Sequence, residues 1–193
     1  MASRVAGKIK FQSVDELLGV PEIAGTQEIE LGRIHAFPNH PFKVLDDERM
    51  DMLVESIREN GILNPVIVRP DKNGDYEMIS GHRRLHAAGI VGLSKIPAIV
   101  KEMSDDEAII KMVDANIQRE EIMPSEKAFA YKMKLEAMKR TAGRPTKENA
   151  CHNGTHLRSD QELALQVGDS ARSIQRYIRL TELIPELLEC IDN

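Results

Sequence analysis

The feature that most constrains this chain is the octapeptide SGHRRLHA at residues 80–87. It follows a run typical of a short strand, residues 76–79, and opens a run typical of a helix that ends at Gly89. A strand, a glycine turn and a helix start leave backbone N–H groups free at the positive end of the helix dipole. Arg83 and Arg84 add forked, permanently charged donors. The segment predicts a cradle for an anionic group such as phosphate; the alternative is a surface helix with two solvated arginines.

The residues on either side of this segment predict an α+β domain with a small sheet. Apolar residues at a helical spacing begin after a capping aspartate, Asp46 or Asp47, and this helical run ends at Gly61. Further on, DKNG at residues 71–74 is typical of a hairpin turn between two strands. The expected strands are residues 65–68, 75–79 and 95–100.

The rest of the chain predicts helices. SDDE at residues 104–107 is a capping-box pattern, and a helix is expected to follow it. Another helix is expected to start at Pro124 and to run to about Arg140. Residues 141–155 are rich in Gly, Pro and Asn and predict a flexible connector. A final apolar run from Pro185 predicts the start of one more helix, cut short by the end of the chain.

A helix-turn-helix pattern lies after the connector. Asp160 is expected to cap its first helix and Ser170 its second, with Gly168 as the left-handed residue of the turn. On the second helix, the face opposite the apolar residues offers guanidinium and amide groups to base edges and phosphates. The alternative is a solvated face of an ordinary helical hairpin. The candidate DNA-binding residues are Ser170, Arg172, Ser173, Gln175, Arg176 and Arg179.

Charge is unevenly distributed along the chain. From Lys127 to Arg179 there are 11 Lys and Arg against 5 Asp and Glu, a net charge of +6. The whole chain carries −5, so the remaining residues carry −11. This asymmetry favours a polyanionic partner for one region only. No run of about 18 apolar residues and no signal peptide is present, so no membrane span is expected. The two distant cysteines, Cys151 and Cys190, fit a reducing cytoplasm.

In chain order, four segments resemble the ParB/Noc family of DNA-partition proteins. GILNP at residues 61–65 is similar to a G-[IV]-L-x-P segment of the family, and residues 81–87 are similar to its G-E-R-R-x-R-A box. Residues 116–124 resemble its E-N-x-Q-R-x-x-L-x-P box, and residues 168–180 resemble its helix-turn-helix. The resemblance covers about residues 28–190.

The resemblance implies a small mixed-sheet N-terminal domain of the ParB/sulfiredoxin-like fold, followed by an all-α helix-turn-helix domain. It implies that the first domain binds CTP and Mg²⁺, and that two copies close into a homodimeric sliding clamp on double-stranded DNA. Loading would start at a centromere-like palindrome during chromosome or plasmid segregation. The resemblance also implies a cytoplasmic, nucleoid-associated bacterial protein, with a ParA-type ATPase partner for the basic tail residues Arg4, Lys8 and Lys10.

These implications divide the chain into five segments. The expected organisation is a flexible basic tail over residues 1–26, a ParB-like nucleotide-binding α+β domain over 27–103, connecting helices over 104–140, a flexible linker over 141–157 and a truncated helix-turn-helix region over 158–193.

Motif by motif, the resemblance implies a set of nucleotide-binding residues. Backbone N–H groups, arginines and an amide oxygen suit a magnesium triphosphate, whose binding is mostly electrostatic positioning. The implied residues are Asn64, Ser80, Gly81, His82, Arg83, Arg84, Asn116, Gln118 and Arg119, with Asn116 also the implied metal-site residue.

Three positions depart from the family pattern. His82 replaces the Glu of the glycine box, and Ala115 replaces the Glu that opens the second box. Asp114 is displaced from Ala115 by about 100° around a helix, so its carboxylate is a poor substitute. Because Ala cannot ligate a metal or orient water, we expect CTP hydrolysis to be slow or absent. Phe42 stands where the family usually has Arg, and the adjacent Lys43 is a candidate to compensate.

Other functions stay open from the sequence. A helix-turn-helix repressor without a nucleotide switch would use the same DNA-binding part. A sulfiredoxin-like enzyme needs a cysteine in the loop, which residues 80–83 lack, and a ParB-superfamily nuclease or kinase needs a clustered acid–base set that this sequence does not show. A zinc site at Cys151, His152 and His156 would have three ligands instead of the usual four.

Overall fold

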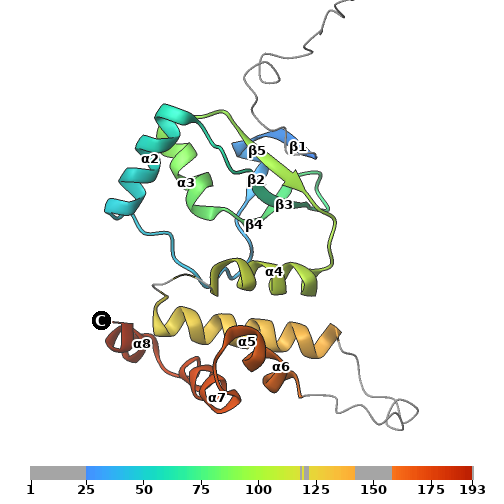
Figure 1. The fold of residues 1–193 in the computed structure, drawn as a ribbon, viewed down its shortest axis with the longest axis vertical. Helices are drawn as coiled ribbons and strands as arrows, with labels where there is room; N and C mark the ends of the chain where they lie inside the picture. The colour runs from blue at the N-terminus through green and yellow to red at the C-terminus, as the bar shows by residue number, and fades with distance from the viewer. Residues whose placement is uncertain (1–24, 118, 120–121, 142–157, 193) are drawn as a thin grey trace, which may run out of the picture.

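The computed structural model describes residues 25–117, 119, 122–141 and 158–192. One half is a mixed sheet flanked by α2 and α3, and the other half consists of helices (Figure 1). The sheet half contains β1 Thr26–Glu30, the 3-10 helix η1 Leu31–Arg33, β2 Ile34–His35, α2 Glu48–Asn60, β3 Val66–Pro70, β4 Tyr76–Ser80, α3 His82–Val91 and β5 Lys95–Val100. The helical half contains α4 Asp105–Ile117, α5 Pro124–Thr141, α6 Ser159–Val167, α7 Ala171–Leu180 and α8 Pro185–Asp192.

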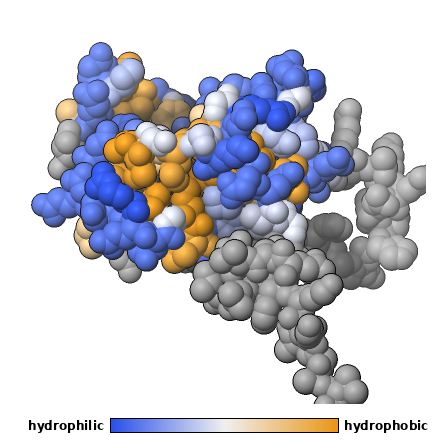
Figure 2. Space-filling model, turned by 90° about the horizontal axis from the view of Figure 1, so that it is seen from above, coloured by the Kyte–Doolittle hydropathy of each residue, from blue (hydrophilic) through white to orange (hydrophobic). Residues whose placement is uncertain are grey.

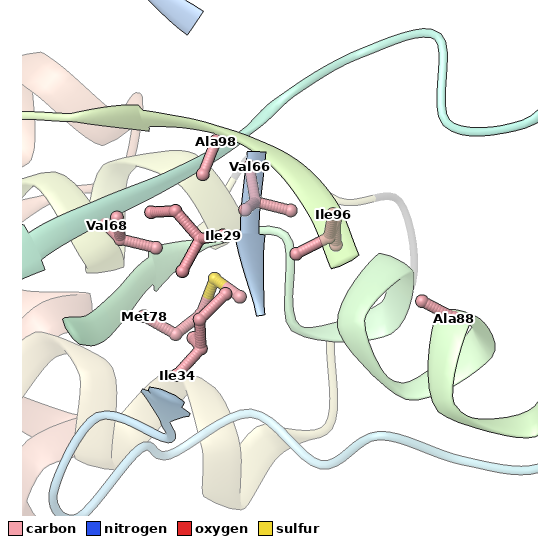
Figure 3. Close-up of a cluster of buried hydrophobic side chains, with 8 residues drawn as sticks. All are labelled: Ile29, Ile34, Val66, Val68, Met78, Ala88, Ile96 and Ala98. Carbon is pink, nitrogen blue, oxygen red and sulfur yellow. The ribbon is translucent and has the colours of Figure 1, made fainter. Parts of the chain in front are cut away.

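The sheet has the strand order β1-β5-β3-β4-β2. β3 and β4 form an antiparallel hairpin, and β5 lies parallel to β3 on its other side. β1 is antiparallel to β5 at one edge, and the short β2 is parallel to β4 at the other. One core cluster gathers side chains from all five strands and from α3 (Figure 3). Its members are Ile29, Ile34, Val66, Val68, Met78, Ala88, Ile96 and Ala98.

Most of the expected elements of this half are confirmed. β3, β4 and β5 lie where the sequence predicts strands. α2 begins after Asp47, whose Oδ1 accepts the N–H of Met50 at 2.8 Å, and Gly61 ends it with a φ of 68°. β1 and β2 were not predicted from the sequence. Only Ile29 is buried in β1, because the strand lies at the sheet edge, so its polar sequence carries no clear strand pattern.

α3 is longer than the sequence predicts. The helix passes through Gly89 and continues to Val91, and Gly92, with a φ of 84°, ends it. The N–H of Gly92 is bonded to the carbonyl of Ala88 at 3.0 Å. The prediction was wrong because two glycines lie close together, and only the second takes the left-handed conformation that stops a helix.

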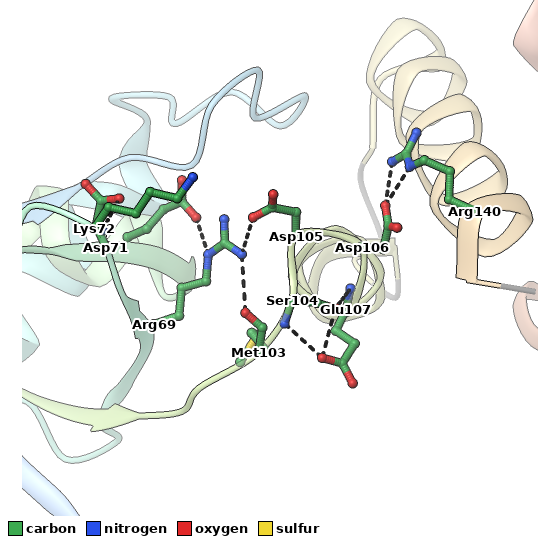
Figure 4. A network of polar contacts seen from close by, with 10 residues as sticks. Arg69, Asp71, Lys72, Met103, Ser104, Asp105, Asp106, Glu107 and Arg140 are labelled. Carbon is green, nitrogen blue, oxygen red and sulfur yellow. Dashed lines mark hydrogen bonds and ion pairs between the residues drawn. The ribbon is translucent and has the colours of Figure 1, made fainter. Parts of the chain in front are cut away.

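Arg69 of β3 fastens the start of α4 to the sheet (Figure 4). Its guanidinium lies 2.5 Å from Glu77 Oε2 on β4 and 2.8 Å from Asp105 Oδ1 on α4. The expected capping box is confirmed: the N–H of Ser104 donates to Glu107 Oε2 at 2.9 Å, and the N–H of Glu107 donates to Ser104 Oγ at 3.3 Å. The sheet therefore fixes where α4 begins.

α5 carries the helix-turn-helix. Tyr131 and Leu135 of α5 form a core cluster with Leu163 of α6 and Ile174 of α7. Ser170 caps α7 as expected, because its Oγ accepts the N–H of Ser173 at 3.0 Å. Gly168 has a φ of 76° in the turn between the two helices, as predicted.

Asp160 is not the N-cap of α6, which corrects the sequence-based expectation. α6 begins at Ser159, so Asp160 lies inside the first turn, and Arg158 holds the cap position. The Asp160 carboxylate still accepts the N–H of Gln161 at 3.1 Å, and it faces Gln175 of α7. Acidic residues are common both at the N-cap and in the first turn of a helix, so the sequence alone does not distinguish the two positions.

Apolar residues are exposed at the sheet end of the molecule. Viewed from above, they form a band between hydrophilic residues (Figure 2). Exposed apolar side chains of the sheet half include Leu45, Met52, Leu63 and Ile90. Within the described part of the chain, no helix is both long enough and apolar enough to cross a bilayer.

Candidate functional site

A cavity of about 650 Å³ lies where α3, the segment leading into α2, and the start of α5 meet. Its basic lining residues are Lys43, Arg49, Arg83 and Arg119. Its acidic lining residues are Asp47, Glu126 and Asp192, and its apolar ones are Leu45, Ile122, Met123 and Pro124. The concentration of cations suits a ligand with several negative charges. Among the described residues, no cluster of His, Cys, Asp and Glu is arranged to hold a metal ion.

Gly81 brings α3 close to the sheet. Its φ is 111°, and a methyl group added there would lie 2.6 Å from Val66 Cγ1 on β3. Arg84, one turn into α3, donates to the carbonyl oxygens of Asn64 and, at 2.8 Å, Pro65. Burial lowers the pKa of Arg84. The Arg84 guanidinium therefore fixes the backbone just before β3. Arg84 is not among the described lining residues of the cavity.

Arg83 points into the cavity and contacts α2. Its Nη2 lies 3.0 Å from Asp47 Oδ1, the same oxygen that caps α2. Burial tends to raise the pKa of Asp47, but the N–H of Met50 and the guanidinium of Arg83 outweigh this, and the pKa is lowered. The ionised carboxylate of Asp47 therefore joins α3 to the start of α2 at the cavity.

Arg119, between α4 and α5, also lines the cavity. Its guanidinium lies 5.9 Å from the centre of the Phe42 ring. Burial and then the repulsion of Arg83 lower the pKa of Arg119. Because two mutually repelling guanidiniums line one cavity, an anion placed between them relieves an unfavourable interaction.

His82 lies behind the cradle. It is 7% exposed, and its ring centre is 3.8 Å from that of His40. Neither ring nitrogen of His82 has a hydrogen-bond partner among the described residues. Burial, followed by the proximity of His40 and Arg119, lowers the pKa of His82 to about 3. In this state it is a neutral, packed ring.

Asn64, Ser80 and Asn116, three further residues of the implied nucleotide site, are not among the described lining residues of the cavity. Asn116 is 3% exposed, and its Nδ2 donates to the carbonyl of Met112 at 2.7 Å. Ser80 ends β4, paired with Ile67, and Asn64 is exposed. Gln118 lies outside the described residues. Arg83 and Arg119 are thus the implied residues that the structure brings together on the cavity.

Sequence reasoning missed Arg49, Glu126 and Asp192 as lining residues. Glu126 carried a signal, since it follows the proline that starts α5; its Oε1 accepts the N–H of Lys43 at 2.7 Å. Arg49 lies in the first turn of α2, and Asp192 reaches the cavity only through packing of α8 against α5. Tertiary structure alone brings these residues to the site.

The residues predicted to bind DNA lie on one exposed face of α7. Arg172, Gln175, Arg176 and Arg179 are exposed. The amide nitrogen of Gln175 lies 3.5 Å from Asp160 Oδ2 on α6. This face is a row of basic and amide groups beside a buried apolar face, which is the composition that duplex DNA recognition needs.

The turn of the helix-turn-helix is held from α5. Asp169 accepts the hydroxyl of Tyr131, and Lys127 Nζ lies 2.9 Å from Asp169 Oδ2. The same ammonium lies 4.9 Å from the centre of the Tyr177 ring. The hydrogen bond from Tyr131, then the contact with Lys127, lower the pKa of Asp169. α5 therefore contacts both the cavity and the turn of the helix-turn-helix.

The fold defines a two-part protein, an α+β domain with a cationic cavity joined to a helical part with a helix-turn-helix. Residues 15–117 match the family model of the ParB N-terminal domain. The chain belongs to this family, which confirms the family resemblance and the expected α+β fold followed by helices.

Known proteins similar to this chain include a chromosome-partitioning protein and a nucleoid occlusion protein. The chromosome-partitioning protein Spo0J of Thermus thermophilus is 35% identical over 170 residues, 88% of this chain and 56% of that protein. A nucleoid occlusion protein of Listeria monocytogenes is 31% identical over 195 residues, 99% of this chain and 61% of that protein. The chain thus spans little more than half the length of these relatives.

A solved structure shows the same fold. C-terminally truncated ParB from Caulobacter crescentus, complexed to the centromeric parS site, aligns with a TM-score of 0.53 and 24% identity. The alignment covers 84% of this chain and 75% of that one.

Proposed function

We propose that this chain is the nucleotide-binding and DNA-binding part of a bacterial DNA-partition protein. The α+β half binds CTP with Mg²⁺, and α6 and α7 bind a centromere-like palindrome in double-stranded DNA. Two copies close into a sliding clamp that associates with the nucleoid in the cytoplasm. The names of the relatives, a chromosome-partitioning protein and a nucleoid occlusion protein, support this proposal, as does the parS-bound ParB of similar fold.

The observation that carries the proposal is the cationic cavity. Arg83 and Arg119 both line it, and Lys43 and Arg49 add two more cations. These groups would hold the phosphates by charge-assisted hydrogen bonds. Asn116 would serve the metal ion; its nitrogen is engaged with Met112, which leaves the amide oxygen as the side-chain atom able to ligate a cation.

Hydrolysis of the nucleotide is proposed to be slow. Ala115 is exposed on α4 and has no ionisable group. The neighbouring Asp114 is ion-paired with Lys134 at 2.5 Å, so its carboxylate already has a partner on α5. The ParA-type partner is proposed for the tail residues Arg4, Lys8 and Lys10, which lie outside the described residues, as does the zinc alternative at Cys151, His152 and His156.

The first prediction concerns the cavity. Titration calorimetry with CTP, ATP and GTP in Mg²⁺ should show selective binding of CTP. Arg83→Ala should weaken that binding by about tenfold or more, because it removes a charge-assisted hydrogen bond worth about 1.5–3 kcal/mol. DNA affinity in the absence of nucleotide should change little, since Arg83 lies on α3, away from α7.

Arg58→Ala is the matched control. Arg58 is exposed on α2 and pairs with Glu55 at 2.6 Å, and it does not line the cavity. It removes the same charge from the same half and should leave the affinity for CTP unchanged. If the wild-type chain binds DNA but no nucleotide, the proposal fails, and a helix-turn-helix repressor becomes the better account.

A further inference from the structure

Three consecutive residues in the first turn of α5 contact three different parts of the molecule. Ser125 is bonded to Asp192 at the end of α8. Glu126 accepts the N–H of Lys43 at the cavity wall. Lys127 is paired with Asp169 in the turn of the helix-turn-helix. This single helical turn therefore lies between the cavity and the DNA-binding helices.

The contact of Asp192 with Ser125 places a negative charge inside the cationic cavity. Asp192 Oδ1 accepts the N–H of Ser125 at 3.0 Å, and Oδ2 accepts the Ser125 hydroxyl at 2.5 Å. Ser125 is 8% exposed, so the contact is shielded from solvent on one side, while Asp192 itself lines the cavity. The carboxylate also lies at the positive end of the 18-residue helix α5.

The chain's own carboxylate thus occupies a position that favours anions, in the same cavity as Arg83 and Arg119. A polyanion entering that cavity meets Asp192 as a like charge. Repulsion between the two anions costs free energy, and the N-terminus of α5 can satisfy only one of them fully. Linkage is reciprocal: if a bound ligand weakens the contact between Asp192 and Ser125, that contact must weaken ligand binding by the same free energy.

We propose that Asp192 is an internal competitor for the phosphate groups of the nucleotide, and that ligand binding releases the end of α8 from α5. This inference rests on the proposed function for the identity of the ligand, CTP. In the ligand-free protein the contact holds α8 against α5 and lowers the affinity of the cavity for polyanions. In the bound protein the end of α8 detaches.

The test compares Asp192→Asn with wild type. Asn keeps the shape of Asp and removes the charge; its amide oxygen can still accept one hydrogen bond from Ser125, and its NH2 group replaces the second acceptor. The probes are CTP with Mg²⁺ and inorganic tripolyphosphate, each measured by titration calorimetry. Removing one negative charge from the cavity should tighten both by about tenfold. Hydrogen exchange of residues 185–192 in wild type should speed up on adding either probe.

Glu186→Gln is the matched control, because Glu186 is exposed on α8 and does not line the cavity. It changes the net charge equally and should leave both affinities unchanged. Ser125→Ala removes one of the two hydrogen bonds to Asp192 and should give a smaller gain in affinity than Asp192→Asn.

The outcomes separate this inference from the proposed function. Equal or weaker binding by Asp192→Asn, or an equal gain in Glu186→Gln, overturns the competitor role even if wild type binds CTP. If CTP does not bind but tripolyphosphate binds Asp192→Asn more tightly than wild type, the competitor role stands and the CTP assignment fails. If neither probe binds either protein, both proposals are overturned.

Discussion

At the scale of single residues, Gly81 is the position where the backbone has least freedom to change. Gly81→Ala would place a methyl group 2.6 Å from Val66 Cγ1, at a φ of 111°. Left-handed strain and overpacking together should lower the free energy of unfolding by about 2–4 kcal/mol. Urea denaturation followed by circular dichroism measures this.

Gly89→Ala in the same helix serves as the comparison. Nothing lies within 4 Å of a methyl group added there. Gly89 is solvent-exposed and lies inside α3. The substitution should raise the free energy of unfolding by about 0.5–1 kcal/mol, because Ala favours the helix. Equal effects at the two positions would contradict the close approach of α3 to β3.

The buried ring of His82 predicts a pH dependence of stability. Above its ordinary pKa of 6.5, His82 is neutral in both the folded and the unfolded chain. Below 6.5 the unfolded chain takes up a proton that the folded chain does not, since the folded pKa is about 3. His82 should therefore reduce the free energy of unfolding by on the order of 2 kcal/mol between pH 7 and pH 5.

His82→Phe tests this contribution. Because neither ring nitrogen has a hydrogen-bond partner among the described residues, an apolar ring of similar size should be accommodated. The variant should lose about 2 kcal/mol less than wild type from pH 7 to pH 5, while the two proteins change in parallel from pH 7 to pH 9. An unchanged acid slope in the variant would sink the assignment.

At the scale of elements, α4 and α5 are joined by an ion pair between a buried lysine and a half-exposed aspartate. Lys134 is 1% exposed, and its Nζ lies 2.5 Å from Asp114 Oδ1. Asp114→Ala removes the partner of the buried ammonium, so it should lower the free energy of unfolding by about 1.5–3 kcal/mol. Lys134→Met replaces the cation with an apolar chain of similar length and should change it by less than about 1 kcal/mol. Chemical denaturation of both variants decides which partner matters; a larger loss in Lys134→Met would reverse the interpretation.

How far the sequence predicts an element depends on how much of that element is buried. β3 and β5 are rich in buried apolar residues, and the sequence predicts them closely. β1 has a single buried residue, Ile29, and β2 is two residues long, so neither shows a periodic pattern. Helix ends are predicted less well than helix positions. Gly89 and Asp160 are residue types typical of helix ends, but both lie inside their helices. Local signals of this kind do not say which of two neighbouring positions packing will choose.

At the scale of the whole molecule, the uneven charge predicts how DNA binding depends on salt. Arg172→Ala and Arg176→Ala should each weaken binding to a specific palindrome by about 1–3 kcal/mol if the residue reads a base. If the residue contacts a phosphate instead, affinity should fall equally for scrambled DNA, and the slope of log K against log salt should decrease by about 1.

Fluorescence anisotropy at several salt concentrations distinguishes the two roles, with Arg58→Ala on α2 as the control for lost charge. No change in either variant would remove α7 from the DNA interface. Equal binding of specific and scrambled DNA by wild type would exclude sequence reading altogether.

The sequence predicts only part of the candidate site, because the residues that line the cavity come from segments far apart in the chain. Arg83 and Arg119 lie in motifs, and both line the cavity. Asp192 lies 67 residues beyond the Ser125 that it contacts, and no local pattern links the two. Glycine geometry and charge patterning are local properties, whereas a cavity is made by contacts between distant segments.

The way α4 and α5 pack also determines where this chain can be recombined with others. One core cluster joins Phe37 and Ile79 of the sheet half to Met112 of α4 and Ala130 of α5. In a chimera spliced at the start of α4, α4 and α5 of the donor protein would have to pack against the sheet half of this chain. Splicing after Thr141 keeps the cluster intact. The helices α6 and α7 are therefore best exchanged from that point, with residues that pack against Tyr131 kept similar in the donor.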